Sequence, residues 1–399
     1  MKVAIIGGGA AGFFSAISVK THHPNYEVHL FERSAKVLSK VRISGGGRCN
    51  VTHDCTAVRD LIKNYPRGAK FLRNALHQFG VAETINWYES HGVPLKVEGD
   101  GRMFPKSDRS ASVIQALTEA SNTLGVELHL SHPVDGMMES NSAWQLESRG
   151  SCMHFDKVIV ATGGSPKKSG LEWLNRLGVV TVDPVPSLFS FNIADEELCQ
   201  LPGLSMPRSR VWLEATKLES IGPLLITHWG MSGPAVLKLS AMGARELSGL
   251  AYQTRLRVQW SADHADETVR GLLQNLDGNK RMIKNEPLFP MPERLWYYLI
   301  QKAGINLEQR WSELSKKEKN RLVEVLTNDV YSTTGKTTNK DEFVTAGGVS
   351  LHEVDPNTMA HKRFKSLYFT GEVLDVDGFT GGFNFQAAWS TAWLAGQLK

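Results

Sequence analysis

Three regularly spaced glycines follow a short apolar run near the start of the chain. Val3–Ile6 leads directly into a turn that contains Gly7, Gly9 and Gly12. In this pattern the first glycine allows a tight turn, the second lets the backbone approach a pyrophosphate, and the third lets the next helix pack closely on the sheet. Glu32 ends the next expected strand, where a carboxylate can accept hydrogen bonds from ribose hydroxyls. The segment therefore predicts a dinucleotide-binding turn, because a merely tight strand–helix turn would leave Glu32 unexplained.

The other end of the sequence carries residues that suit the same large ligand. Residues 369–384 are rich in glycine and acidic side chains and run into an expected final helix, Ala387–Leu398. The carboxylates of Glu372, Asp375 and Asp377 can bind ribityl hydroxyls, and the glycines free backbone N–H groups for a pyrophosphate or a flavin carbonyl. The positive end of the helix would point at the flavin. A nicotinamide dehydrogenase has no need of this segment, so both ends together predict one FAD site; solvated loop carboxylates are the alternative.

A third unusual segment, Ser44–Asn50, contains three consecutive glycines. Such a run costs folding entropy, so we expect another group to approach its backbone closely. Lys40, Arg42 and Arg48 would add positive charge for phosphates or for a reduced flavin anion. An ordinary surface loop with solvated basic residues explains the glycine density equally well.

Cys49, in this segment, allows a sharper hypothesis. Flavoprotein disulfide reductases carry two redox cysteines separated by four residues at this point of the sequence. Cys49 and Cys55 are separated by five residues, which changes the relative direction of their side chains and disfavours a dithiol shuttle. Cys49 could instead be a proton donor beside the flavin, and a small thiol that packs near the cofactor is the simpler interpretation.

The predicted cofactor site extends these motifs to their neighbours. A strand that ends at Ala161 would bring backbone close to the dinucleotide a second time. A second glycine fingerprint is missing downstream, so NAD(P)H would bind only transiently, at the flavin face. The predicted FAD-binding residues are Gly7, Gly9, Ala10, Ala11, Gly12, Glu32, Arg33, Lys40, Ser44, Gly45, Gly46, Gly47, Arg48, Cys49, Asn50, Ala161, Thr162, Gly163, Gly164, Gly371, Glu372, Asp375, Asp377, Gly378, Gly381, Gly382, Phe383 and Asn384.

Other polar residues have weaker claims to a function. His228 is a candidate general acid or substrate ligand, although a hydrogen-bonded structural histidine is the simpler interpretation. No metal-ligand spacing stands out, and the sequence predicts no metal. Several basic stretches could form a nucleic-acid face or a solvated surface; they are Arg59–Arg73, Lys96–Arg109, Lys167–Lys168, Arg208 with Arg210, and His361–Lys365.

The order of expected elements explains how these residues could meet. Val3–Ile6, Ala10–Lys20 and Glu27–Phe31 read as strand, helix and strand, the unit of a parallel Rossmann-type sheet. Lys157–Ala161 is almost entirely apolar, as in a strand covered on both faces. The sequence therefore predicts an α/β fold with a split cofactor domain, residues 1–187 and 345–399.

A different pattern separates these two parts. Leu188–Ile193, Arg210–Ala215 and Thr254–Trp260 alternate apolar and polar residues, as half-buried antiparallel strands do. The pattern from Asp266 to Thr327 is helical. We therefore expect an inserted β unit that itself carries a helical subdomain.

Bulk properties fit an ordinary globular enzyme. The chain has 399 residues, 41% hydrophobic and 22% charged, which predicts two or three domains. Four scattered cysteines do not make a disulfide scaffold. The apolar start reads as a strand and no apolar run reaches the length of a membrane span, so we expect a cytoplasmic protein. A net charge of +4 permits a polyanionic partner but does not require one.

The sequence resembles the BaiN/YhiN-like family of NAD(P)/FAD-dependent oxidoreductases over essentially its whole length. The Gly-Gly-Arg-Cys-Asn and Gly-Glu-x-Leu-Asp-x-x-Gly segments are more specific for this family than the glycine fingerprint. The motifs that carry the resemblance lie, in order, at residues 7–12, 44–50, 101–105, 227–234, 345–349 and 371–378.

The resemblance implies a Rossmann-type FAD-binding domain, an inserted β-barrel-like domain at 188–265 and 333–344, and a small helical subdomain at 266–332. It also implies tightly bound, non-covalent FAD and an NAD(P)H-driven reduction of an activated C=C bond, with Cys49 as the candidate proton donor. Among the family's substrates, uridine in ribosomal RNA suits a basic protein best, giving dihydrouridine. The alternatives are an FAD oxidase of a small amine and a flavin-containing RNA- or ribosome-binding protein without turnover.

Overall fold

The protein, described by a computed structural model for residues 1–140, 143–338 and 344–399, divides into two compact units. Unit 1 comprises Met1–Ser187 and Lys340–Lys399, and unit 2 comprises Leu188–Asn339. The predicted barrel segment 333–344 runs partly into 339–343, which lie outside the described residues.

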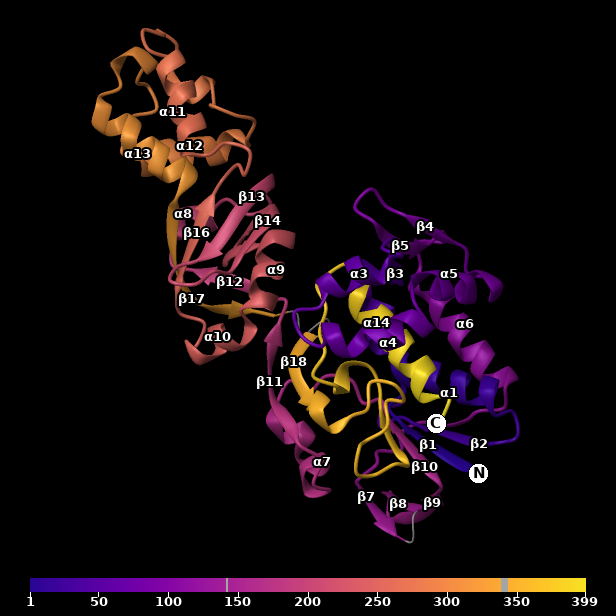
Figure 1. The fold of residues 1–399 in the computed structure, drawn as a ribbon. Coiled ribbons are helices and arrows are strands. Elements are labelled where there is room, and N and C mark those ends of the chain that lie inside the picture. Colours follow the sequence, from indigo (N-terminus) through magenta and orange to yellow (C-terminus); the bar gives the residue numbers. More distant parts are fainter. Residues whose placement is uncertain (141–142, 339–343) are drawn as a thin grey trace. The chain divides into compact units, whose positions relative to one another are not determined.

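A five-stranded parallel sheet forms the centre of unit 1 (Figure 1). Its inner strands are mostly apolar and buried, whereas the edge strand β6 (Glu127–His129) is half-exposed and has polar residues at both ends. The register places Ile5 beside Leu30 on one side and beside Ile159 on the other. In spatial order the strands are β19 (Leu367–Phe369), β10 (Lys157–Val160), β1 (Lys2–Ile6), β2 (Glu27–Phe31) and β6 (Glu127–His129).

The two ends of the chain pack against each other beside this sheet. Helix α1 (Ala10–His22) and helix α14 (Phe383–Ala395) lie side by side (Figure 1). The Ser18 hydroxyl donates to the carbonyl oxygen of Trp393 at 2.7 Å. Phe14 of α1 also packs against Trp389 of α14, with ring centroids 5.3 Å apart. The close packing makes α1 and α14 parts of one core.

Smaller elements complete unit 1. Two three-stranded antiparallel sheets and one two-stranded sheet lie around the parallel sheet. Their strands are β3 (Thr52–His53), β4 (Leu95–Val97) and β5 (Arg102–Pro105); β7 (Gly136–Ser140), β8 (Ala143–Ser148) and β9 (Ser151–Phe155); and β11 (Thr181–Ser187) with β18 (Val344–Val349). The other helices are α2 (Ser39–Gly47), α3 (Val58–Leu61), α4 (Ala69–Gln78), α5 (Val81–Ser90), α6 (Ser110–Thr123) and α7 (Glu172–Arg176).

Unit 2 is built on a closed antiparallel barrel (Figure 1). Along its strands every second residue faces the interior, and Val211 and Leu213 are two such buried residues of β13. Around the barrel the strands are β12 (Ser190–Ile193), β15 (Gly230–Ser232), β14 (Glu219–Thr227), β13 (Ser205–Leu213), β16 (Arg255–Gln259) and β17 (Asp329–Thr337). Its helices are α8 (Glu196–Cys199), α9 (Pro234–Met242), α10 (Ala244–Gly249), α11 (Asp266–Asn275), α12 (Glu293–Lys302) and α13 (Lys316–Thr327).

A buried polar group joins the helical part of unit 2 to its barrel. The Lys302 ammonium of α12 lies 2.7 Å from the Asp329 carboxylate of β17. The same carboxylate accepts hydrogen bonds from the Tyr331 hydroxyl at 2.5 Å and from the Trp260 indole at 3.1 Å. Buried charge requires such pairing, so this group fixes where α12 meets the barrel.

The α/β sheet, the barrel and the helices confirm the predicted fold class, but two predicted boundaries differ. The helical pattern was expected to end at Thr327, where α13 does end, but the helical subdomain was expected to reach residue 332, and β17 already begins at Asp329. Asp329, Tyr331 and Thr333 are buried alternately, which is the period of a strand. The final helix begins at Phe383 instead of Ala387, since Gly382 supplies the left-handed residue (φ 91°) before it. Among the described residues, each helix is too short or too polar to span a bilayer.

Candidate functional site

The glycine turn after β1 combines tight packing with one open position. Gly7 has φ 116° and donates its N–H to the Phe31 carbonyl at 2.8 Å. A Cβ at Gly7 would collide with the carbonyl oxygen of Ala161, and one at Gly12 would overlap the carbonyl oxygen of Gly7. A Cβ at Gly9 would have no described atom within 4 Å. Gly7 and Gly12 therefore serve the packing, while the backbone at Gly9 is accessible to a ligand.

Glu32 is held at this turn by backbone groups on both of its oxygens. Oε2 accepts from the N–H of Gly8 at 2.9 Å, and Oε1 accepts from the N–H of Ser34 at 2.8 Å. A carboxylate oxygen has two lone-pair sites, so each oxygen can still accept a hydroxyl proton. The position fits the predicted role of Glu32 at a ribose.

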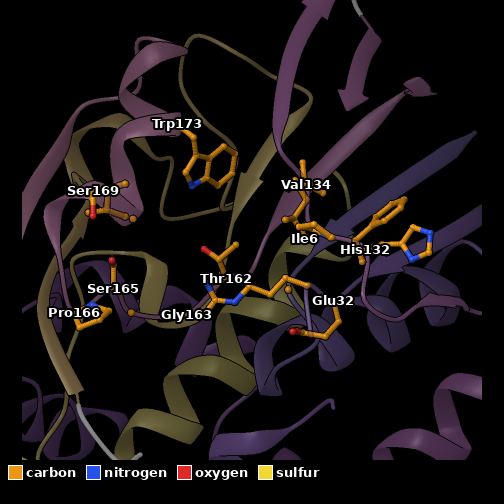
Figure 2. A pocket seen from close by; sticks show the side chains of 17 residues that line it. Ile6, Glu32, His132, Val134, Thr162, Gly163, Ser165, Pro166, Ser169 and Trp173 are labelled. Atoms are coloured by element: carbon orange, nitrogen blue, oxygen red, sulfur yellow. The ribbon is translucent and has the colours of Figure 1, made fainter. Parts of the chain in front are cut away.

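A pocket of about 350 Å³ opens in front of these residues. Figure 2 shows Thr162 and Gly163 with Glu32 around it, and Trp173 further along its wall. The size is that of a small-ligand pocket, and it suits part of a dinucleotide. The lining residues are Ile6, Gly7, Phe31, Glu32, Arg33, His132, Pro133, Val134, Thr162, Gly163, Gly164, Ser165, Pro166, Ser169, Gly170, Leu171 and Trp173.

The segment Ser44–Asn50 lies partly in helix α2 and partly in a left-handed turn. Ser44 leaves the helical conformation (ψ 147°), and Gly45, Gly46 and Gly47 follow with φ of 59°, 70° and 83°. A Cβ at Gly45 would lie 2.9 Å from the Phe104 ring, whereas Gly46 and Gly47 have no described atom within 4 Å of that position. Two of the three glycines thus present backbone that a ligand can approach, and the assignment of this loop to a cofactor stays a prediction.

The cations of this region differ in their partners. The Lys40 ammonium lies 2.7 Å from Glu372, so it connects α2 to the C-terminal segment. Arg48 lies 2.5 Å from the Glu98 carboxylate and stacks on Phe104, with its guanidinium 4.0 Å from the ring centroid. We therefore place Arg48 with the protein's own carboxylates and not at a phosphate.

Cys49 is fully buried and has φ 63°. Burial raises the pKa of its thiol to about 12, so the thiol stays protonated at neutral pH. Cys55, which is partly exposed, is also a free thiol. The burial favours the packing interpretation of Cys49 over direct access to a substrate.

Glu372 organises the C-terminal side of the site. Besides its contact with Lys40, it accepts the N–H of Thr345 at 3.1 Å. Gly164 lies against both residues, because a Cβ there would collide with the hydroxyl of Thr345 and lie 2.5 Å from Glu372. The Thr345 hydroxyl is buried and has no hydrogen-bond partner among the described residues. An orphaned polar group of this kind needs an explanation, and a bound ligand supplies one. Sequence reasoning missed Thr345 as a site residue, although its motif at 345–349 was recognised.

Two predicted ligand contacts are corrected by the structure. Asp377 was expected at ribityl hydroxyls, but its buried carboxylate is paired bidentately with Arg67 and accepts from the Ser187 hydroxyl at 2.7 Å. The N–H of Gly378 was expected to be available, but it donates to the side chain of Asn384 at 2.7 Å. The local pattern could not reveal these partners, since Arg67 lies 310 residues from Asp377 along the chain.

Glycines near the final helix also serve the packing. The N–H of Gly371 donates to Thr391 at 2.9 Å, and a Cβ on Gly371 would lie 2.7 Å from that of Ala11. A Cβ on Gly382 would lie 2.5 Å from the Thr52 carbonyl oxygen. The first turn of α1 and the segment before α14 therefore meet directly, which brings the two predicted halves of the site together.

The remaining predicted residues lie around this junction. Asn50 is buried, and its Oδ1 has no hydrogen-bond partner in the described part of the chain. Phe383 is buried and stacks on His53 at 4.8 Å. Of the others, Ala10 and Ala11 begin α1, Arg33 lines the pocket, Ala161 follows β10, Asp375 is buried and donates its N–H to Val349, and Gly381 lies against Phe383.

His228 and the basic pair Arg208 with Arg210 belong to unit 2, whereas the other basic stretches belong to unit 1. His228 is exposed in the turn between β14 and β15 of unit 2. The basic stretches are distributed over both units, and several cations lie beside carboxylates. Such pairs are Lys96 with Asp108 at 2.5 Å, Lys168 with Asp183 at 3.1 Å, and Arg208 with Asp263 at 3.1 Å.

Comparison with known proteins identifies the kind of protein to which this site belongs. A family model described as HI0933-like protein Rossmann domain matches residues 1–398. The chain belongs to this family. Family membership confirms the resemblance that the motifs indicate, the character of the protein as a flavoprotein, and an oxidoreductase as the class of enzyme.

Two curated relatives match the chain over nearly its full length. The 3-dehydro-bile acid Δ(4,6)-reductase of Clostridium scindens is 28% identical over 406 residues, covering 99% of this chain and 98% of the relative. The ribosomal RNA dihydrouridine synthase of Escherichia coli is 28% identical over 409 residues, covering 98% and 96%. Identity therefore does not distinguish between these two relatives.

Solved structures share the fold. A 3-ketosteroid-Δ4-(5α)-dehydrogenase from Rhodococcus jostii matches with a TM-score of 0.52 and 12% identity, covering 100% of this chain and 96% of that chain. A 3-ketosteroid Δ1-dehydrogenase from Sterolibacterium denitrificans matches with a TM-score of 0.51 and 11% identity, covering 99% and 98%. At this level of identity the likeness concerns the architecture alone.

Proposed function

We propose that the protein is an FAD-dependent enzyme that uses NAD(P)H to reduce a C=C bond activated by a neighbouring carbonyl. The observation that carries this proposal is a pair of contacts in unit 1, which hold Glu32 at the glycine turn and Lys40 of α2 at Glu372. The chain that makes them matches two relatives over nearly its full length. Both relatives' names describe the gain of hydrogen across a double bond, one in a bile acid and one in uridine.

Residues of unit 1 can be assigned to successive parts of FAD, from the ribose through the pyrophosphate to the flavin. Glu32 would accept hydrogen bonds from the ribose hydroxyls in the pocket. The open backbone at Gly9, at the start of α1, would face the pyrophosphate. Gly46, Lys40 and Glu372 would hold the flavin end. When bound, FAD supplies the hydride-transfer chemistry that no side chain of this site provides.

Protonation of the second carbon requires a donor within hydrogen-bond reach of it. Cys49 is the donor proposed from the sequence, and its high pKa keeps the proton on sulfur at neutral pH. Comparison of Cys49→Ser with Cys49→Ala tests it. A proton donor requires the hydroxyl that only serine retains, so alanine should lower kcat far more than serine. Equal activity of the two variants would assign Cys49 to packing.

Among possible substrates we favour uridine in ribosomal RNA, because the chain is basic and one of its two full-length relatives is named for that reaction. The test is the dihydrouridine content of ribosomal RNA from a strain that lacks the gene. Loss of dihydrouridine, restored by the wild-type gene, is the expected result. An unchanged dihydrouridine content would exclude uridine in ribosomal RNA as the substrate. Small carbonyl-conjugated alkenes would then be the substrates to test.

Anaerobic mixing tests the reaction class independently of the substrate. The flavin absorbance should bleach with NADPH or NADH and return when an enone acceptor is added. Bleaching by a small amine but not by either nicotinamide would identify an oxidase instead.

A further inference from the structure

A group of titratable side chains lies at the edge of the parallel sheet and belongs to none of the elements assigned to FAD binding. His29 is on β2, and Glu127 and His129 are on the edge strand β6. The parallel register pairs His29 with Glu127 and Phe31 with His129, so these side chains share one face of the sheet. Their ligand atoms all lie within 4.8 Å of one another.

The separations match those around one small cation. His29 Nδ1 lies 3.0 Å from His129 Nε2, and Glu127 lies 3.4 Å from each of these nitrogens through its two oxygens. Ligand atoms at about 2.1 Å from a tetrahedral Zn²⁺ are about 3.4 Å apart. Small side-chain movements would therefore bring all three groups to bonding distance of one ion.

A carboxylate outside this group fixes the tautomer of His29. Glu27 Oε1 lies 2.8 Å from His29 Nε2 and 3.0 Å from the ammonium of Lys2. A carboxylate at this distance accepts the Nε2–H of His29, and in the neutral ring Nδ1 then presents a lone pair. This is the arrangement of a carboxylate that orients a metal-binding histidine.

When His29 is neutral, its Nδ1 lone pair and both oxygens of Glu127 lie close to His129 Nε2. Neutral His129 can place one proton on that nitrogen and serve one of these acceptors, and the exposed Glu127 carboxylate is also open to water. A second proton, as an imidazolium, is the alternative to a metal ion. The rings are also restrained, because Phe31 stacks on His129 at 4.6 Å and Phe155 meets His29 edge-on at 5.3 Å.

We propose that His29, Glu127 and His129 form a binding site for one Zn²⁺ ion, with Glu27 as the positioning residue and water at the fourth coordination position. Two imidazoles and one carboxylate are the ligand types that zinc accepts. The sequence predicted no metal because His29 lies about 100 residues from the other two ligands and only the sheet brings them together. The site does not depend on the proposed reaction.

The site also adjoins the pocket through the backbone. The N–H of Glu32 donates to the carbonyl of His129 at 2.9 Å, and the N–H of His132 donates to the carbonyl of Glu32 at 2.8 Å. An ion shared by β2 and β6 would therefore brace the edge strand that supports this wall of the pocket.

The test uses the full-length protein with Cys152→Ser, because the exposed Cys152 thiol could bind zinc by itself. After treatment with EDTA and desalting, Zn²⁺ is titrated by calorimetry, and Co²⁺ is added in a parallel sample to record its visible absorption. The expected result is one saturable equivalent of Zn²⁺ per chain at micromolar concentration and a tetrahedral Co²⁺ spectrum. His129→Gln and Glu127→Gln should each weaken Zn²⁺ binding at least ~10-fold, and Glu27→Gln about 10-fold.

The exposed His154 of strand β9 provides the matched control, and His154→Gln should bind Zn²⁺ like the parent. Melting in EDTA tests whether the variants fold, and added Zn²⁺ should raise the melting temperature of the parent and of His154→Gln but not of His129→Gln. No saturable binding by the parent, or equal affinity in the parent and His129→Gln, would overturn the proposal and leave a hydrogen-bonded histidine pair.

Discussion

Glu32 should affect both the stability of the protein and its affinity for FAD, and the two effects can be separated. Glu32→Gln leaves one oxygen and replaces the other by an amide group that cannot accept. One of the two backbone hydrogen bonds, to Gly8 or to Ser34, is then lost. Hydrogen bonds to charged groups contribute about 1.5–3 kcal/mol, so we expect the free energy of unfolding without FAD to fall by about this amount.

The same substitution removes the charged acceptor for a ribose hydroxyl. A loss of about 1.5–3 kcal/mol of binding energy corresponds to a Kd for FAD about 10- to 150-fold higher. Urea unfolding of the apoprotein and the quenching of flavin fluorescence on binding measure the two quantities.

Glu83 offers a matched control for Glu32. Its carboxylate accepts the N–H of Gly80 at 2.8 Å and caps helix α5, and it does not line the pocket. Glu83→Gln should therefore lower the stability modestly, by about 1 kcal/mol, and leave the Kd for FAD unchanged. If Glu32→Gln binds FAD as tightly as Glu83→Gln does, the assignment of Glu32 to the ribose is wrong.

Three further predictions follow from the geometry. Gly12→Ala should lower the free energy of unfolding in urea by about 1–3 kcal/mol or more, because its Cβ would overlap the backbone. Gly46→Ala should lower it only by the ~1–2 kcal/mol that a left-handed alanine costs, and its main effect should be weaker FAD binding. The folded state holds the Cys49 proton up to about pH 12, whereas the unfolded chain loses it from about pH 9. The free energy of unfolding should therefore fall between these pH values by about 1.4 kcal/mol per pH unit, and Cys49→Ala should remove this part of the slope. Asp377→Ala deletes the buried carboxylate that faces Arg67 and should cost about 3–5 kcal/mol in urea unfolding; a cost below 1 kcal/mol would contradict a structural role for this pair.

The sequence predicted most accurately those features whose causes are local. The turn at Gly7, Gly9 and Gly12 follows from steric rules that act within a few residues, and the strands on either side follow from their apolar runs. Glu32 could be placed because a fixed strand–helix–strand length brings it back to the turn. The family match confirmed this part of the fold.

Features that depend on distant partners could not be predicted in the same way. Asp377 looks like a ligand-binding carboxylate until Arg67 is seen beside it, and the orphaned hydroxyl of Thr345 is recognisable only beside Glu372. The far wall of the pocket, residues 165–173, carries no motif of its own. Cys49 shows the same limit, because its reactivity depends on burial by residues outside its segment.

The packing of α1 against α14 also has a consequence for the order of events during synthesis. The two segments of unit 1 are synthesised before and after unit 2. The roughly 150 residues of unit 2 take about 8–30 s to synthesise at 5–20 residues per second. Unit 2 has its own closed barrel and can fold in that interval. During this time the sheet of unit 1 still lacks β19, and the face of α1 that α14 will cover is exposed to solvent or to chaperones. Loading of FAD is then a late event, and nascent chains stalled before Phe383 should be prone to aggregation and unable to retain the cofactor.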